Sequence, residues 1–84
     1  MARIRWVGDD EASGPVADIY AAWRAANPGR PVVPGILKCL SLCPDLLRGM
    51  IDVSDRVHFA EGHLSRRIKE MIATYVSALN ACRY

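Results

Sequence analysis

The spacing of apolar residues predicts helices along most of the chain. A first helix is expected to start at Ser13-Gly14-Pro15, because proline at the first helical position loses no needed hydrogen bond and serine is a favourable cap. It should end near Ala26, since the Asn-Pro-Gly sequence at 27–29 opens a stiff loop that runs to Gly35. Apolar residues three and four positions apart form its buried face: Val16, Ile19, Tyr20 and Trp23.

The middle of the chain holds two further predicted helices. Residues 36–42 form a short apolar run that is interpreted as helical and that ends before Pro44. Pro44 and the acidic residue after it are typical of a first helical turn, so a third helix should run from there to about Phe59. Gly62, in the turn that follows, is expected to take the left-handed conformation that ends a helix.

The fourth predicted helix carries the strongest periodic signal. Ser65 is its expected cap, and its apolar stripe consists of Ile68, Met71, Ile72, Tyr75, Val76 and Leu79. No segment shows the sustained alternation of a strand, so the prediction is an all-α fold, a small bundle of about four helices, with residues 1–84 as a single domain. The apolar stripes of the predicted helices are wide for a bundle of so few helices. We expect another subunit or further chain to cover part of them, and a compact monomeric bundle is the alternative.

Composition places the chain among folded globular proteins. Of its 84 residues, 51% are hydrophobic and 24% are charged, which excludes the disordered and collagen-like classes. A net charge of +2 is too small to indicate nucleic acid or an anionic membrane as a partner, and the acidic run at residues 9–11 is interpreted as a solvated lead-in. No stretch reaches the ~18 apolar residues of a membrane span. With no signal peptide and three cysteines, the protein is expected to be cytoplasmic.

Two cysteines and two histidines have a spacing close to that of a zinc finger. They are Cys39, Cys43, His58 and His63, in the pattern C-x3-C-x14-H-x4-H. The cysteines lie in the apolar run and not in a β-hairpin, so we interpret them as small buried thiols and predict no metal site. The histidines are given structural roles, His58 because a cation there complements the C-terminal dipole of its helix.

Glu70 and Cys82 are the strongest candidates for residues that take part in a reaction. Glu70 shares its helix face mostly with small or polar residues, so it is compatible with a polar pocket between helices and at least equally with an exposed glutamate. Cys82 would stand ~18 Å further along a straight helix. The two cooperate only if the chain turns, which we expect at Asn80 in a left-handed conformation, with Cys82 opening a new helix whose dipole favours the thiolate.

Three cations at the start of the same helix oppose its dipole: Arg66, Arg67 and Lys69. They are expected to meet either a partner's carboxylate or solvent.

Residues 64–84 read LSRRIKEMIATYVSALNACRY and resemble the active-site segment of the alkylhydroperoxidase D-like and carboxymuconolactone decarboxylase superfamily, especially its peroxidase-related branch. Members typically read Leu-Ser, charged residues, glutamate, an apolar stretch ending near Ser-Ala-Leu-Asn, and then Cys-x-x-Cys. Upstream, the Gly-Pro-Val helix start, the proline-rich loop and the Pro-Asp-Leu-Leu helix start are similar to the same family. The resemblance implies an all-helical subunit that forms a homo-oligomer, uses thiols without a haem, flavin or metal cofactor, and takes electrons from a dithiol reductant protein.

The resemblance also implies roles for two residues. Glu70 matches the glutamate that relays protons to the cysteine pair, and Cys82 matches the first, resolving cysteine of that pair. The second cysteine, which attacks the peroxide, would follow Tyr84, where the 84 residues stop. We therefore expect the N-terminal portion of a thiol-dependent alkyl hydroperoxide peroxidase, an antioxidant enzyme, without turnover as it stands. A non-redox, decarboxylase-like enzyme and a helical oligomerisation module are the alternatives.

Overall fold

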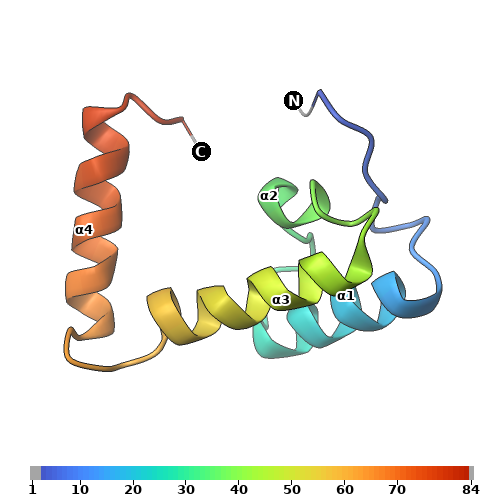
Figure 1. Cartoon of the computed structure of the whole chain (residues 1–84), viewed down its shortest axis with the longest axis horizontal. Helices are drawn as coiled ribbons and strands as arrows, with labels where there is room; N and C mark the ends of the chain where they lie inside the picture. The colour runs from blue at the N-terminus through green and yellow to red at the C-terminus, as the bar shows by residue number, and fades with distance from the viewer. Residues whose placement is uncertain (1–2, 84) are drawn as a thin grey trace. The chain divides into compact units, whose positions relative to one another are not determined.

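The computed structural model describes residues 3–83 and divides the chain into two compact units, Met1–Ile51 and Asp52–Tyr84 (Figure 1). Every regular element among the described residues is helical and none is a strand, which confirms the predicted all-α class. Within the same residues, no helix is both long enough and apolar enough to cross a membrane. The single domain over residues 1–84 stays a prediction.

The first unit contains α1, Gly14–Ala26, which has the predicted bounds. Ser13 is at the N-cap position with extended backbone, but its side chain makes no capping hydrogen bond. Gly14 has a φ of 58°, a left-handed conformation in which a Cβ is unfavourable, so the chain needs glycine where it enters this helix. At the other end, the Asn27 side-chain amide donates to the Trp23 carbonyl oxygen at 2.8 Å and closes the last turn.

The apolar face of α1 forms the core of this unit, as its spacing predicts. Leu47, from α3 (Pro44–Ser54), is fully buried against it. Fully burying an aliphatic or aromatic side chain of this size contributes about 1.5–3 kcal/mol, so a few such residues determine the stability of so small a unit. The five buried core residues are Val16, Ile19, Tyr20, Val33 and Leu47.

α2, Gly35–Lys38, is shorter than the apolar run that predicts it. Beyond Lys38 the backbone continues through tighter three-residue turns, such as the hydrogen bond from Cys43 N to Leu40 O at 3.1 Å. The ring of Pro44 disfavours the helical region for the residue before it, so the run ends there and α3 begins with a proline in its first turn. The predicted helix is therefore present only in its first half.

Three hydrogen bonds fix the N-terminal segment on the core of the first unit. The Tyr20 hydroxyl donates to the Val7 carbonyl oxygen at 2.7 Å, and the Val7 amide donates to Ser41 Oγ at 2.7 Å. Ser41 Oγ donates in turn to the Lys38 carbonyl oxygen at 2.6 Å. Because Tyr20 and Ser41 are both 1% exposed, these bonds satisfy polar groups that water does not reach.

Asp9 is the centre of a partly buried ion-pair network, so the interpretation of residues 9–11 as a solvated lead-in is wrong at this position. Its carboxylate is paired with Lys38 Nζ, accepts from Arg24 Nη2 at 2.8 Å, and accepts from the Val33 amide at 3.0 Å. Lys38 is itself buried, and a buried cation needs such a partner. The network joins the N-terminal segment to α1 and α2.

The second unit holds the end of α3, the π-helix η1, Asp55–Phe59, and α4, Arg66–Leu79. Together α3 and η1 span the predicted range 44–59, but the last five residues form a π-helix, a wider turn that is frequent at functional sites. The extended backbone of Ala60 ends η1. Because the helix already ends there, Gly62 is not its cap and has no positive φ, and the prediction of a left-handed glycine is wrong.

Candidate functional site

Ser65 starts α4 and orients its first turns. As predicted, its side chain caps the helix: Ser65 Oγ accepts a hydrogen bond from the Ile68 amide at 3.2 Å. Lys69 Nζ donates to the Ala60 carbonyl oxygen at 2.8 Å and ties the same end of α4 to the preceding loop. These two contacts position Glu70, the next residue, beside the end of η1.

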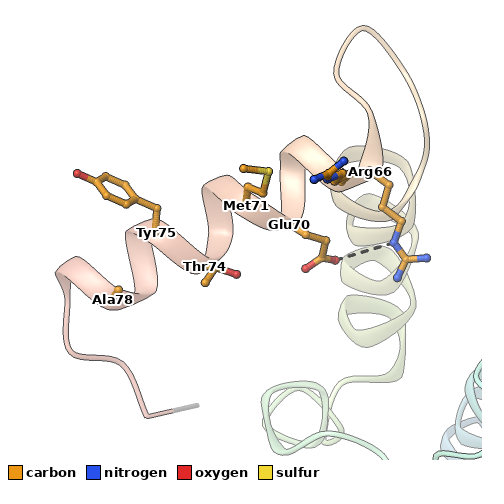
Figure 2. A pocket seen from close by; sticks show the side chains of 7 residues that line it. Arg66, Glu70, Met71, Thr74, Tyr75 and Ala78 are labelled. Atoms are coloured by element: carbon orange, nitrogen blue, oxygen red, sulfur yellow. Dashed lines mark ion pairs between the residues drawn. The ribbon is translucent and has the colours of Figure 1, made fainter.

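Glu70 lies between two basic side chains, His58 and Arg66, of which Figure 2 shows Arg66. Its Oε1 atom is 3.2 Å from His58 Nε2 and 3.9 Å from Arg66 Nε. The Glu70 side chain is 47% exposed and that of His58 is 33% exposed, so the carboxylate lies neither in a closed pocket nor fully in solvent. Water screens a pair of this kind, and its contribution to stability is at most about 1 kcal/mol.

Phe59 positions both basic partners of Glu70. The His58 and Phe59 rings stand edge to face, with centroids 4.6 Å apart, and Arg66 Cζ lies 5.2 Å from the centre of the Phe59 ring. His58 and Phe59 are the last two residues of η1, so this π-helical turn determines where the imidazole meets α4. An imidazole and a carboxylate at hydrogen-bond distance can exchange a proton, which is the basis of general acid–base chemistry.

An open groove runs along α4 beside Glu70. Figure 2 shows the side chains of Glu70 and Thr74 on one side of the helix, with Tyr75 directed away from them. All the lining residues come from α4, so the groove is one face of a single helix and does not exclude water as an active site must. They are Arg66, Arg67, Glu70, Met71, Thr74, Tyr75 and Ala78.

Cys82 follows α4 and is exposed, and the new helix predicted to start there would lie outside the described residues. α4 ends in a Schellman motif, in which Ala81 N donates to Ala78 O at 3.1 Å and Cys82 N donates to Ser77 O at 2.9 Å. The left-handed residue is Ala81, with φ 50°, and not Asn80, whose side chain donates back to a carbonyl of the preceding turn. The Cys82 amide thus closes α4 and is not one of the free amides of a helix start.

Ala81→Gly should stabilise this helix end. A Cβ in the left-handed conformation costs about 1 kcal/mol that glycine avoids. Amide hydrogen exchange should therefore show the Ala78–Cys82 turn protected about fivefold more strongly in the variant. Ala78→Gly, inside the helix, is the matched control and should lower protection, because glycine there costs about 0.5–1 kcal/mol. If both variants shift protection in the same direction, the turn is not left-handed at Ala81.

The residues singled out for chemistry lie apart from one another. Glu70 contacts η1, whereas Cys82 lies beyond the C-terminal turn of α4, and the helix alone rises ~13 Å from Glu70 to its end at Leu79. Cys39 and Cys43 are free thiols of the first unit. The prediction of buried thiols is wrong for Cys43, which is exposed because it occupies the turn before α3, and Cys39 is only partly buried. Within the described part of the chain, no three His, Cys, Asp or Glu side chains gather as a metal ion would require.

No protein-family model, curated protein or solved structure matches this chain. The candidate site therefore rests on the motif of its last segment and on the geometry around Glu70. His58 is the partner that the sequence pattern did not reveal, because a contact between two helices leaves no periodic signal. The only hint is the short 60–65 connection, which keeps the start of α4 close to the end of η1.

Proposed function

We propose that this chain carries the proton-relay part of an alkylhydroperoxidase D-like, thiol-dependent peroxidase that acts as a homo-oligomer with a dithiol protein as reductant. The supporting observation is the spacing between Glu70 and Cys82 in the last segment. Glu70 stands twelve positions before Cys82 within the Leu-Ser to Cys-x-x pattern of that family, and it has an imidazole at hydrogen-bond distance.

In the proposed reaction two thiols reduce one hydroperoxide. The attacking thiolate takes the terminal oxygen of ROOH, becomes a sulfenic acid, and releases ROH when the leaving oxygen is protonated. Cys82 then attacks the sulfenic sulfur, which forms the disulfide and releases water. Glu70, backed by His58, is the proposed relay that accepts the thiol proton and returns it to the leaving oxygen. Because Cys82 lies beyond the end of α4, this role requires the segment after Ala81 to fold back along the helix toward Glu70. The dithiol partner reduces the disulfide and completes the cycle.

The test is hydroperoxide reduction by a chain with a cysteine added directly after Tyr84, supplied with dithiothreitol. We expect turnover that Glu70→Gln lowers by about a hundredfold, the usual scale of general acid–base catalysis. Ser77→Ala, an exposed position on the same helix face, is the control and should leave the rate unchanged. The unextended 84-residue chain should show no turnover. Equal rates for the extended chain and its Glu70→Gln variant would exclude the proton-relay role.

A helical oligomerisation module is the second candidate, and the exposed apolar face of α4 favours it. A chain whose only role is assembly would show the same association state with or without Cys82 and no peroxide reduction after extension. A non-redox, decarboxylase-like enzyme would also be independent of Cys82. The peroxide assay therefore separates the first candidate from both alternatives.

A further inference from the structure

Two polar contacts join the start of α4 to the end of η1 inside the second unit. Glu70 Oε1 lies 3.2 Å from His58 Nε2. Lys69 Nζ donates at 2.8 Å to the carbonyl oxygen of Ala60, the residue directly after η1. An ammonium group keeps its charge throughout the physiological pH range, whereas an imidazole gains or loses a proton within it. Of these two contacts, the one between His58 and Glu70 therefore depends on pH.

The protonation state of the imidazole decides how well it donates to the Glu70 carboxylate. A neutral imidazole has a proton on one nitrogen, so only the tautomer protonated at Nε2 can donate across the 3.2 Å contact. A protonated imidazole has a proton on both nitrogens and always has a donor there. It also adds the Coulomb attraction of a cation for the carboxylate. Protonation of His58 therefore strengthens its contact with Glu70.

The charged groups around His58 do not reverse this effect. On α4, Arg66 Nε lies 3.9 Å from the same Glu70 oxygen, but a guanidinium keeps its charge whatever the state of the imidazole. On η1, the Arg56 guanidinium is paired with the Asp52 carboxylate at 3.1 Å. His58 itself lies in the last turn of η1, where the negative end of the helix dipole favours a cation. The other ionisable side chains of η1, the loop and the first turns of α4 are Asp55, Glu61, His63, Arg67 and Lys69. Imidazole is the one side-chain type among all these groups that changes charge in the physiological pH range.

We propose that the contact between His58 and Glu70 is a pH-sensitive attachment of α4 to η1. Its added strength is present while the imidazole is protonated and is lost as the pH rises through the range in which the imidazole loses its proton. The first turns of α4 should therefore open more often at about pH 7.5 than at about pH 5.5. The proposal does not rest on the peroxidase reaction, because it concerns two side chains in contact and no thiol. Failure of the peroxide assay would leave it standing.

Amide hydrogen exchange, followed residue by residue by NMR, tests this attachment. Protection factors correct for the direct effect of pH on exchange, so they report the opening of the helix. We expect the amides of residues 69–72 to be protected about threefold more strongly at about pH 5.5 than at about pH 7.5, because a half-exposed ion pair has an effect of this size. Equal protection at the two pH values in the wild-type chain would overturn the proposal. First turns of α4 without measurable protection at either pH would overturn it as well, since nothing would then attach them.

Substitutions show whether the effect belongs to this pair of side chains. His58→Gln should abolish the pH dependence, because its side-chain amide can still donate to Glu70 but has no charge to gain. Glu70→Gln should abolish it from the other side of the contact. His63→Gln, which replaces the exposed histidine of the loop, is the matched control and should keep the difference between the two pH values. Circular dichroism checks that all three variants keep their helices. A pH dependence that survives in both His58→Gln and Glu70→Gln would overturn the proposal.

Discussion

Asp9→Asn should lower the free energy of unfolding of the first unit by about 3 kcal/mol. The substitution removes the anion that holds buried Lys38 and that also accepts from Arg24, so it leaves one cation buried without a charge partner. Both tryptophans, Trp6 and Trp23, lie in this unit, and their fluorescence in a urea titration measures its unfolding.

The pH dependence of stability gives the same network a second test. Burial raises the pKa of the Asp9 carboxyl, but hydrogen bonds from Lys38, the Val33 amide and Arg24, together with the Lys38 charge, outweigh it and hold the pKa well below its usual range. The unfolded chain therefore binds the proton first as pH falls. The contribution of Asp9 is fully present above about pH 5 and declines as pH drops below about 4, the ordinary aspartate pKa.

Asp10→Asn is the control for both measurements, because Asp10 is exposed and next in the chain. We expect it to change stability by less than about 0.5 kcal/mol at neutral pH. The difference in stability between wild type and Asp9→Asn should narrow as the pH falls toward 2. A difference that stays constant from neutral to acidic pH would show that the Asp9 charge does not stabilise the folded unit.

Leu47→Ala should destabilise the first unit by about 3 kcal/mol, because it opens a cavity at a fully buried position between α1 and α3. For a unit this small, such a loss is a large part of the total stability. Leu46→Ala makes the same change at a position that is 50% exposed and should cost less than about 1 kcal/mol. The same urea titration compares them, and equal costs would contradict the burial of Leu47.

The helices could be predicted because their signals are local. The apolar spacing of α1 and α4, and the side-chain cap at Ser65, lie within one or two turns of the elements that they define. α2 ends at Lys38, short of the predicted end, and η1 widens into a π-helix; no residue pattern marks either change. Ala81 occupies a left-handed position that usually belongs to glycine or asparagine, which is why Asn80 is the natural but wrong expectation.

The contacts between elements could not be predicted in the same way. Asp9 reaches partners at least 15 positions away, so its neighbours in the chain do not distinguish it from the exposed carboxylates beside it. Glu70 follows from its place in the family-like segment, but the imidazole of His58 reaches it only through the geometry of η1 and the loop before α4. A sequence motif can point to a candidate residue such as Glu70, but it does not identify the side chains from other elements that contact it.

The most direct test of the proposed thiol chemistry follows which sulfur atoms react. The chain with a cysteine added directly after Tyr84 is treated with one equivalent of cumene hydroperoxide, and its disulfides are mapped by peptide mass spectrometry. We predict one disulfide, between Cys82 and the added cysteine, with Cys39 and Cys43 still thiols. A Cys82 that stays reduced while other thiols oxidise would contradict the account.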